Sequence, residues 1–166
     1  DVICPRFGSV WMKEGNHEFR HPRYVKKGSP QLLGIEGHDI PSYLKLVERG
    51  IRWVPWNAVI QVNHLSIIHG HEFRRGLSNP VNPARGLFLR AKSSSLWSHF
   101  HQTSHHSEGT ITGKRIACWS IGCLCDMRPE YDPMAYTRWN HGFALLNAGD
   151  DWFEVDNRMI VEGKVR

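Results

Sequence analysis

The sequence predicts a mixed α/β fold whose C-terminal half is rich in β-structure. Short apolar stretches at residues 9–14, 65–68 and 94–97 have the composition of strands, and polar residues follow each one directly. Two stretches between them begin with helix-capping residues. In layered α/β folds, ligands bind where neighbouring strands end at one edge of a sheet. Strand ends are therefore where we expect the functional residues.

Composition limits the classes of protein that the chain can belong to. A length of 166 residues suits one domain, and 40% hydrophobic with 22% charged residues excludes a disordered or fibrous protein. Lysine and arginine exceed aspartate and glutamate by 21 to 16, and a net charge of +5 suits an anionic partner. The sequence has no signal peptide and no apolar run of membrane-spanning length, so we expect a cytoplasmic protein that does not bind a membrane.

The first half of the chain is expected to begin with a strand at residues 9–14 that stops at Gly15. Residues 20–30 are basic and contain proline and glycine, which predicts a surface loop with one helical turn. Asp39 and Pro41 begin a helix that Gly50 ends. Further strands are expected at 51–54, 58–62 and 65–68.

The second half is expected to begin with a helix capped by Asn82, which buries Leu87 and Phe88. A strand at 94–97 follows, residues 102–113 are polar enough to predict a flexible loop, and 114–119 predict a strand. Residues 125–138 predict an irregular segment. A hairpin at 141–147 and 152–155 and a last strand at 158–161 complete this half.

Two histidines, His99 and His101, lie one residue apart after the strand at 94–97. Side chains at i and i+2 of an extended segment point the same way, so the pair can present two imidazoles to one small volume. Asn16 follows the first strand, and His69 follows the strand at 65–68. One metal site is the simplest interpretation, because imidazoles and amide oxygens both bind divalent metals. His71 is expected either to contact a metal ligand without binding metal itself or to be incidental.

The four cysteines are Cys4, Cys118, Cys123 and Cys125. The last three lie in an apolar stretch and lack the paired spacing of a zinc ribbon. They are predicted to be reduced thiols, with Cys123 and Cys125 in the core.

Three motifs in order carry a resemblance to a known family. Gly15-Asn16-His17-Glu18, an apolar strand ending in His69-Gly70, and Ser98-His99-Phe100-His101 together resemble the calcineurin-like metallophosphoesterases, in particular the phage and prophage branch. The resemblance implies a four-layer α/β/β/α sandwich, of which this chain would hold the second sheet and part of the first. It also implies a metal-dependent phosphoesterase that hydrolyses phosphomono- or phosphodiesters with two divalent metal ions, from among Mn, Fe, Zn and Ni.

The same resemblance assigns a role to each matching residue. Asn16, His69 and His99 would bind one metal ion, and His101 would bind the other. His17 would not bind metal but would protonate the leaving oxygen as a general acid. Arg20, just after it, is the candidate for binding the phosphate, because its fork matches phosphate oxygens. A salt bridge within the loop is an equal alternative for Arg20.

The sequence also departs from the family pattern. The family motifs Asp-x-His and Gly-Asp-x-x-Asp are missing from residues 2–14, and Ser98 replaces a glycine. Residues 1–166 are therefore expected to be a single metallophosphoesterase domain that lacks its N-terminal portion and hydrolyses phosphodiesters poorly on its own. A catalytically inactive nucleic-acid-binding module of the same fold is the alternative. A zinc endonuclease of the HNH type is disfavoured by the cysteine spacing. The substrate class is a phosphate ester, with nucleic acid as one option, and neither the metal nor the oligomeric state follows from the sequence.

Overall fold

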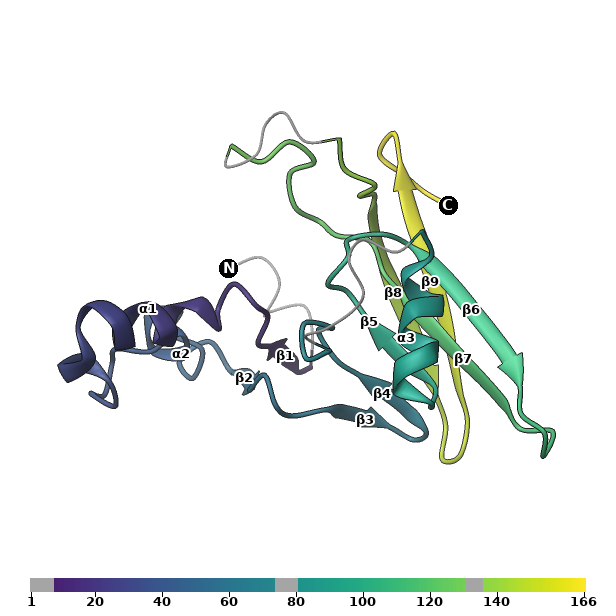
Figure 1. Ribbon diagram of the computed structural model, residues 1–166, viewed down its shortest axis with the longest axis horizontal. Helices are drawn as coiled ribbons and strands as arrows, with labels where there is room; N and C mark the ends of the chain where they lie inside the picture. Colours follow the sequence, from purple (N-terminus) through teal and green to yellow (C-terminus); the bar gives the residue numbers. More distant parts are fainter. Residues whose placement is uncertain (1–7, 74–80, 131–135) are drawn as a thin grey trace. The chain divides into compact units, whose positions relative to one another are not determined.

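The computed structural model describes residues 8–73, 81–130 and 136–166 and divides into two compact units, residues 1–58 and 59–166 (Figure 1). In the first unit, β1 (Val10–Lys13) pairs in parallel with β2 (Ile51–Val54). The chain between these strands forms α1 (Arg20–Gly28), the 3-10 helix η2 (Pro30–Leu32) and α2 (Ile40–Tyr43). The strands at 9–14 and 51–54 are thus confirmed.

Hydrogen bonds continue the β1–β2 pairing beyond the ends of both strands. Glu14 N donates to Val54 O at 2.8 Å, and the buried carboxylate of Glu14 accepts from Trp56 N at 2.9 Å. Lys13 Nζ donates to the carbonyls of Pro55 and Trp56, each at 3.0 Å. These bonds fix the position from which the Gly15-Asn16-His17-Glu18 turn leaves the sheet.

Two predictions for the first unit are wrong in extent. Residues 20–28 form a full helix rather than a loop with one turn, because Pro22 lies in the first turn, where its missing N–H has no partner to lose. The helix that Asp39 caps is shorter than predicted and ends at Tyr43. Lys45 adopts a left-handed φ of 52°, a conformation that terminates helices. The cap itself is confirmed, since Asp39 Oδ1 accepts from Ser42 N at 2.8 Å.

The second unit is built on a five-stranded sheet in the order β3-β4-β5-β7-β6. Its central strands β4 (Leu65–Ile67), β5 (Ser95–Trp97) and β7 (Arg115–Ser120) run parallel to one another. The outer strands β3 (Ile60–Val62) and β6 (Ser104–Gly109) pair antiparallel with β4 and β7. Parallel central strands bring the ends of β4, β5 and β7 to the same edge of the sheet.

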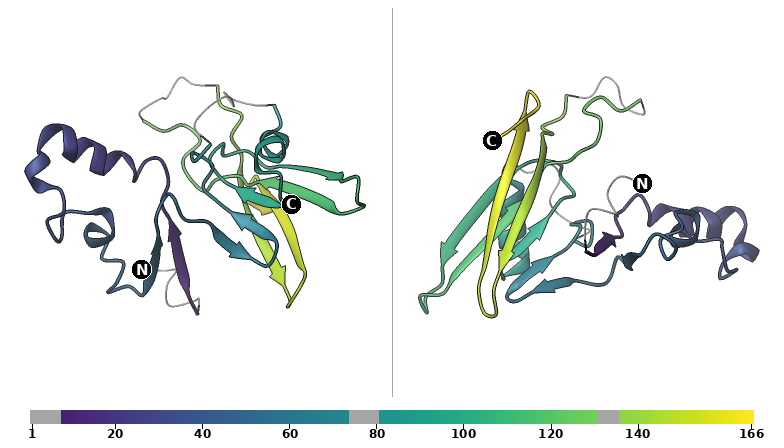
Figure 2. Two further views of the ribbon diagram at one scale, coloured as in Figure 1. Left: turned by 60° about the horizontal axis from the view of Figure 1, so that its bottom comes forward. Right: turned by 180° about the vertical axis from the view of Figure 1, so that it is seen from behind.

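Layers of structure cover both faces of this sheet. The helix α3 (Pro83–Ala91) packs on one face, and a smaller sheet of β8 (His141–Ala148), β9 (Phe153–Val161) and β10 (Lys164–Val165) covers the other (Figures 1 and 2). Successive side chains of β7 point to opposite faces of the sheet. Cys118 belongs to the buried core under α3, whereas the centroid of the Trp119 ring lies 6.1 Å from that of Phe153 in β9. The order is therefore helix, sheet, sheet.

The mixed α/β class and the β-rich C-terminal half are confirmed, and the three layers are those that part of an α/β/β/α sandwich contains. The helix that Asn82 caps is also confirmed, with Asn82 Oδ1 accepting from Arg85 N at 3.0 Å. The loop predicted at 102–113 is wrong, because residues 104–109 form β6 against β7. The strands predicted at 152–155 and 158–161 are one continuous β9. No helix among the described residues is long and apolar enough to cross a membrane.

The core under α3 gives a direct test of the helix-on-sheet packing. Leu87 is fully buried against Trp97 and Cys118, whereas Leu89 on the same helix is 47% exposed. We expect Leu87→Ala to lower the free energy of unfolding by about 2–5 kcal/mol, because it leaves a cavity in the core. Leu89→Ala, the matched control, should cost less than about 1 kcal/mol. Urea unfolding followed by circular dichroism measures both, and equal losses would contradict this packing.

Candidate metal-binding site

Three segments rich in metal-binding side chains follow the three parallel strands of the second unit. His69, His71 and Glu72 come after β4, and His99 and His101 come after β5. The loop after β7 contains Cys123 and Cys125. Since β4, β5 and β7 are parallel neighbours, all these residues leave the sheet at one edge.

The first group, called the histidine group below, consists of His69, His71, His99 and Glu72. The His69 and His99 rings have centroids 5.0 Å apart, and the His71 ring lies 4.9 Å from His69 and 6.5 Å from His99. Nδ1 of His69 and Nδ1 of His71 are 3.0 Å apart. One ligand atom from each of His69, His71 and Glu72 lies within 4.8 Å of the others.

Backbone hydrogen bonds hold the histidine group together. The carbonyl of His69 accepts from the amides of both Ser98 and His99, at 3.1 and 3.0 Å. The carboxylate of Glu72 accepts from Gly70 N at 2.6 Å and from His69 N at 3.3 Å. The turn after β5 is therefore fastened directly to the turn after β4, and the approach of His69 to His99 follows from the backbone.

Gly70 makes this close approach possible. Its φ is +118°, a conformation that side chains rarely adopt. A Cβ at this position would lie 2.8 Å from Trp97 Cε3 and 2.9 Å from His99 Cβ. The turn after β4 thus passes so close to His99 that only glycine fits.

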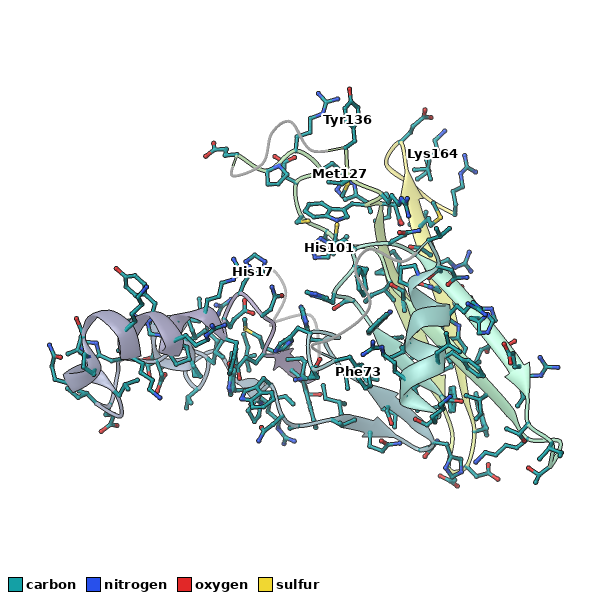
Figure 3. All side chains as sticks on the ribbon, viewed as in Figure 1. His17, Phe73, His101, Met127, Tyr136 and Lys164 are labelled. Carbon is teal, nitrogen blue, oxygen red and sulfur yellow. The ribbon has the colours of Figure 1, made fainter. Side chains whose placement is uncertain are left out.

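The second group, called the thiol group below, consists of His101, Cys123 and Cys125. Cys125 Sγ lies 3.2 Å from Cys123 Sγ and 3.8 Å from His101 Nδ1. The Trp139 ring packs edge-on against His101 with centroids 4.6 Å apart. Figure 3 shows the side chains of the second unit with His101 labelled.

The cysteines differ in environment, and one prediction about them is wrong. Cys118 is fully buried, which raises the pKa of its thiol to about 11. Cys125 is exposed and Cys123 only half-buried, so neither is a core thiol. Partial burial, and after it the interaction with the neighbouring Cys125 thiol, raises the pKa of Cys123 to about 11.

The donor atoms of the histidine group fit a divalent metal ion. Neutral imidazoles suit Mn, Fe, Zn and Ni, and a carboxylate can complete such a set. The chain thus has candidate groups for divalent metal binding. His71 and Glu72 were not predicted as ligands, although the i, i+2 spacing of His69 and His71 gave the same signal as His99 and His101.

The other predicted site residues belong to the first unit. Asn16 is half-buried and His17 exposed in the turn after β1, where Gly15 N donates to the Glu18 carboxylate at 3.0 Å. Arg20 is exposed at the start of α1. A hollow of about 260 Å³ borders this turn and is lined in part by Glu14 and Glu18. The convergence of Asn16 with His69, His99 and His101 stays a prediction, and so does the approach of His17 to the phosphate.

Comparisons with known proteins add a limited likeness. No family model and no curated protein matches the chain. The solved structures similar to it include a single mutant and a double mutant of Vps29 from Entamoeba histolytica. Each is 14% identical, with 95% of this chain and 94% of that chain covered and a TM-score of 0.42. A likeness with a TM-score this low carries no argument for this chain.

Gly70 provides a test of the histidine group's construction. We expect Gly70→Ala to lower the free energy of unfolding by about 1–3 kcal/mol, because alanine is strained at this φ and its Cβ meets Trp97 and His99. Gly109→Ala is the matched control, since a Cβ there meets nothing within 4 Å. Chemical unfolding measures both variants. A Gly70→Ala protein as stable as the control would show that the turn does not pass so close to His99.

Proposed function

We propose that this chain is part of a metal-dependent phosphoesterase. The observation that carries the proposal is the approach of His69 and His99, with ring centroids 5.0 Å apart at the ends of two parallel strands. Each lies in one of the three motifs that resemble the calcineurin-like metallophosphoesterases. His69 and His99 are 30 positions apart and occur in the motif order of that family. The backbone carbonyl of His69 accepts from the amide of His99 and links the two turns. Together the two histidines support a metal site more strongly than either alone.

In this proposal, His69 and His99 hold one divalent ion, and Asn16 adds its amide oxygen. His101 binds a second ion. When bound, a pair of divalent ions polarises a phosphoryl oxygen and neutralises the charge that develops on it. Manganese, iron, zinc and nickel all suit the imidazole and carboxylate donors of the histidine group.

The chain's own residues would bind the substrate and transfer a proton. His17 would hold a proton on its imidazole and donate it to the leaving oxygen of the ester. Its exposure in the turn after β1 leaves the ring accessible to a substrate. Arg20, the first residue of α1, would donate its guanidinium hydrogens to the phosphate oxygens. Both belong to one short turn, in which Arg20 N donates to His17 O at 3.1 Å.

Nucleic-acid binding without turnover is the second candidate function, and one observation favours it. The helix α1 exposes four cationic side chains and has no acidic residue in its first turn. The four are Arg20, Arg23, Lys26 and Lys27. A row of exposed cations on one helix attracts the phosphates of a nucleic acid, and the affinity falls as salt rises.

Metal binding is the first test. We expect the protein to bind Mn²⁺ in isothermal titration, and His99→Ala to weaken this binding by at least about tenfold, because an imidazole ligand is lost. His64→Ala is the matched control, since His64 is an exposed histidine of the same unit. Equal Mn²⁺ affinity for His99→Ala and the unchanged protein would overturn the metal assignment.

The role of His17 is tested in the full-length protein, by turnover of an aryl phosphodiester with Mn²⁺ present. We expect His17→Ala to lower turnover by roughly 10²–10⁴-fold, the usual effect of losing a general acid, while Mn²⁺ content stays unchanged. Loss of Mn²⁺ from His17→Ala would make it a ligand rather than an acid. Salt-sensitive binding of single-stranded DNA, with no turnover of any phosphate ester, would favour the second candidate function.

A further inference from the structure

The thiol group lies at the same sheet edge as the histidine group but has a different donor chemistry. One ligand atom from each of His101, Cys123 and Cys125 lies within 4.8 Å of the others. The three residues come from the segments after β5 and β7, which are parallel neighbours. The cluster therefore comes from two distant parts of the sequence, which sheet topology brings together.

One residue fixes both halves of the cluster. The amide of Asn140 donates to the carbonyl of His101 at 2.9 Å, and the carbonyl of Asn140 accepts from Cys123 N at 3.0 Å. The Asn140 side chain is itself held, since its Oδ1 accepts from Thr103 N at 2.7 Å and its Nδ2 donates to Thr103 Oγ1 at 2.8 Å. The backbones that carry His101 and Cys123 are thus joined through a single residue.

Further contacts place the second cysteine and make room for the loop. His141 Nε2 donates to the carbonyl of Cys125 at 2.9 Å. The backbones of Cys123 and His141 form an isolated parallel β-bridge, and Gly142 N donates to Cys123 O at 3.0 Å. A Cβ on Gly122 would lie 2.6 Å from Asn140 O, so the loop after β7 needs glycine there. Both cysteines are therefore held by backbone contacts before any ligand arrives.

The distances suit a tetrahedral metal ion. Zinc bonds of about 2.3 Å to sulfur and about 2.0–2.1 Å to nitrogen place two sulfurs roughly 3.8 Å apart, and a sulfur and a nitrogen roughly 3.5 Å apart. The observed distances are 3.2 Å between the sulfurs and 3.8 Å between Cys125 Sγ and His101 Nδ1. Side-chain movements of about half an ångström bring these two distances to zinc geometry. The third distance, between the ligand atoms of Cys123 and His101, is within 4.8 Å.

We propose that His101, Cys123 and Cys125 form a zinc site with two thiolates and one imidazole. Thiolate donors select zinc and other soft ions over Mn²⁺ or Mg²⁺, which prefer oxygen. Three protein ligands leave the fourth position of the ion for water. The exposed Cys125 gives the ion a path from solvent. The site uses Nδ1 of His101, so a zinc ion here would replace the second ion that the phosphoesterase proposal assigns to this histidine. The zinc proposal does not rest on that proposal.

Cobalt is the probe for this site, because it occupies zinc sites and reports thiolate bonds as a charge-transfer absorption. We expect Co²⁺ added to the reduced protein to produce a band with the intensity of two thiolates, which added Zn²⁺ abolishes. Cys125→Ser should lose at least half of the band and weaken Co²⁺ binding by at least about tenfold. Cys118→Ala, the matched control, removes a thiol that bonds to Ser93 O and should leave the band unchanged.

A second measurement does not depend on cobalt. Zinc should slow alkylation of Cys125 by iodoacetamide at least about tenfold, as mapped by peptide mass spectrometry, because a metal-bound thiolate is a poorer nucleophile. Circular dichroism checks that Cys125→Ser is folded, which we expect because Cys125 is exposed.

The outcomes separate this site from the histidine group. His69→Ala and His99→Ala should keep the cobalt–thiolate band, and Cys125→Ser should keep Mn²⁺ binding. The absence of a band in protein whose thiols titrate as reduced would overturn the proposal, and so would a full band in folded Cys125→Ser. Loss of the band in His69→Ala would also overturn it, because the metal would then belong to the histidine group.

Discussion

The parallel pairing of β4, β5 and β7 is the constraint on which both candidate sites depend. Every histidine and cysteine of the two groups follows the end of one of these strands. The pairing continues past the strand ends, since the carbonyl of His69 accepts from Ser98 and His99, and Trp97 O accepts from Ile121 N at 3.0 Å. Backbone hydrogen bonds therefore bring the residues of each group together, and their metal-binding side-chain atoms lie close to one another as a result. The core of Leu87, Trp97 and Cys118 under α3 supports this pairing from one face.

Much of the second unit could be predicted because its strands are apolar and its helix is capped. Sequence reasoning failed where pairing overrides composition. Residues 104–109 are polar, yet they form β6 because an edge strand needs only one hydrogen-bonded neighbour and can expose polar side chains to water. The ring of His105 lies 5.3 Å from Trp119, and His106 bonds to Glu108 at 2.7 Å. The contact of His105 comes from β7 and cannot be predicted from the local sequence, whereas the bond between His106 and Glu108 lies within β6.

His99 and His101 were predicted as metal ligands from their i, i+2 spacing, but the structure places them by a different backbone conformation. The i, i+2 rule assumes an extended backbone at 99–101, but His101 has a left-handed φ of 55° and its amide donates to Ser98 O at 3.0 Å. This tight turn accounts for the contacts of His99 with His69 and of His101 with Cys125. The spacing of Cys123 and Cys125 does not match a zinc ribbon, and this pattern alone predicts no metal site. The rule that ligands gather at strand ends would have included them, since their loop follows a strand beside β5.

The two groups share one turn, and this links their chemistry. Residues 98–101 carry His99 into the histidine group and His101 into the thiol group, while the His69 carbonyl holds the start of the turn. An ion bound at either group would hold the turn more firmly, but it would also repel the ion at the other group, because both ions are positively charged. Any coupling between the two ions is reciprocal. Because imidazole and carboxylate donors accept harder ions than thiolates do, the two positions would keep different metals even when filled together.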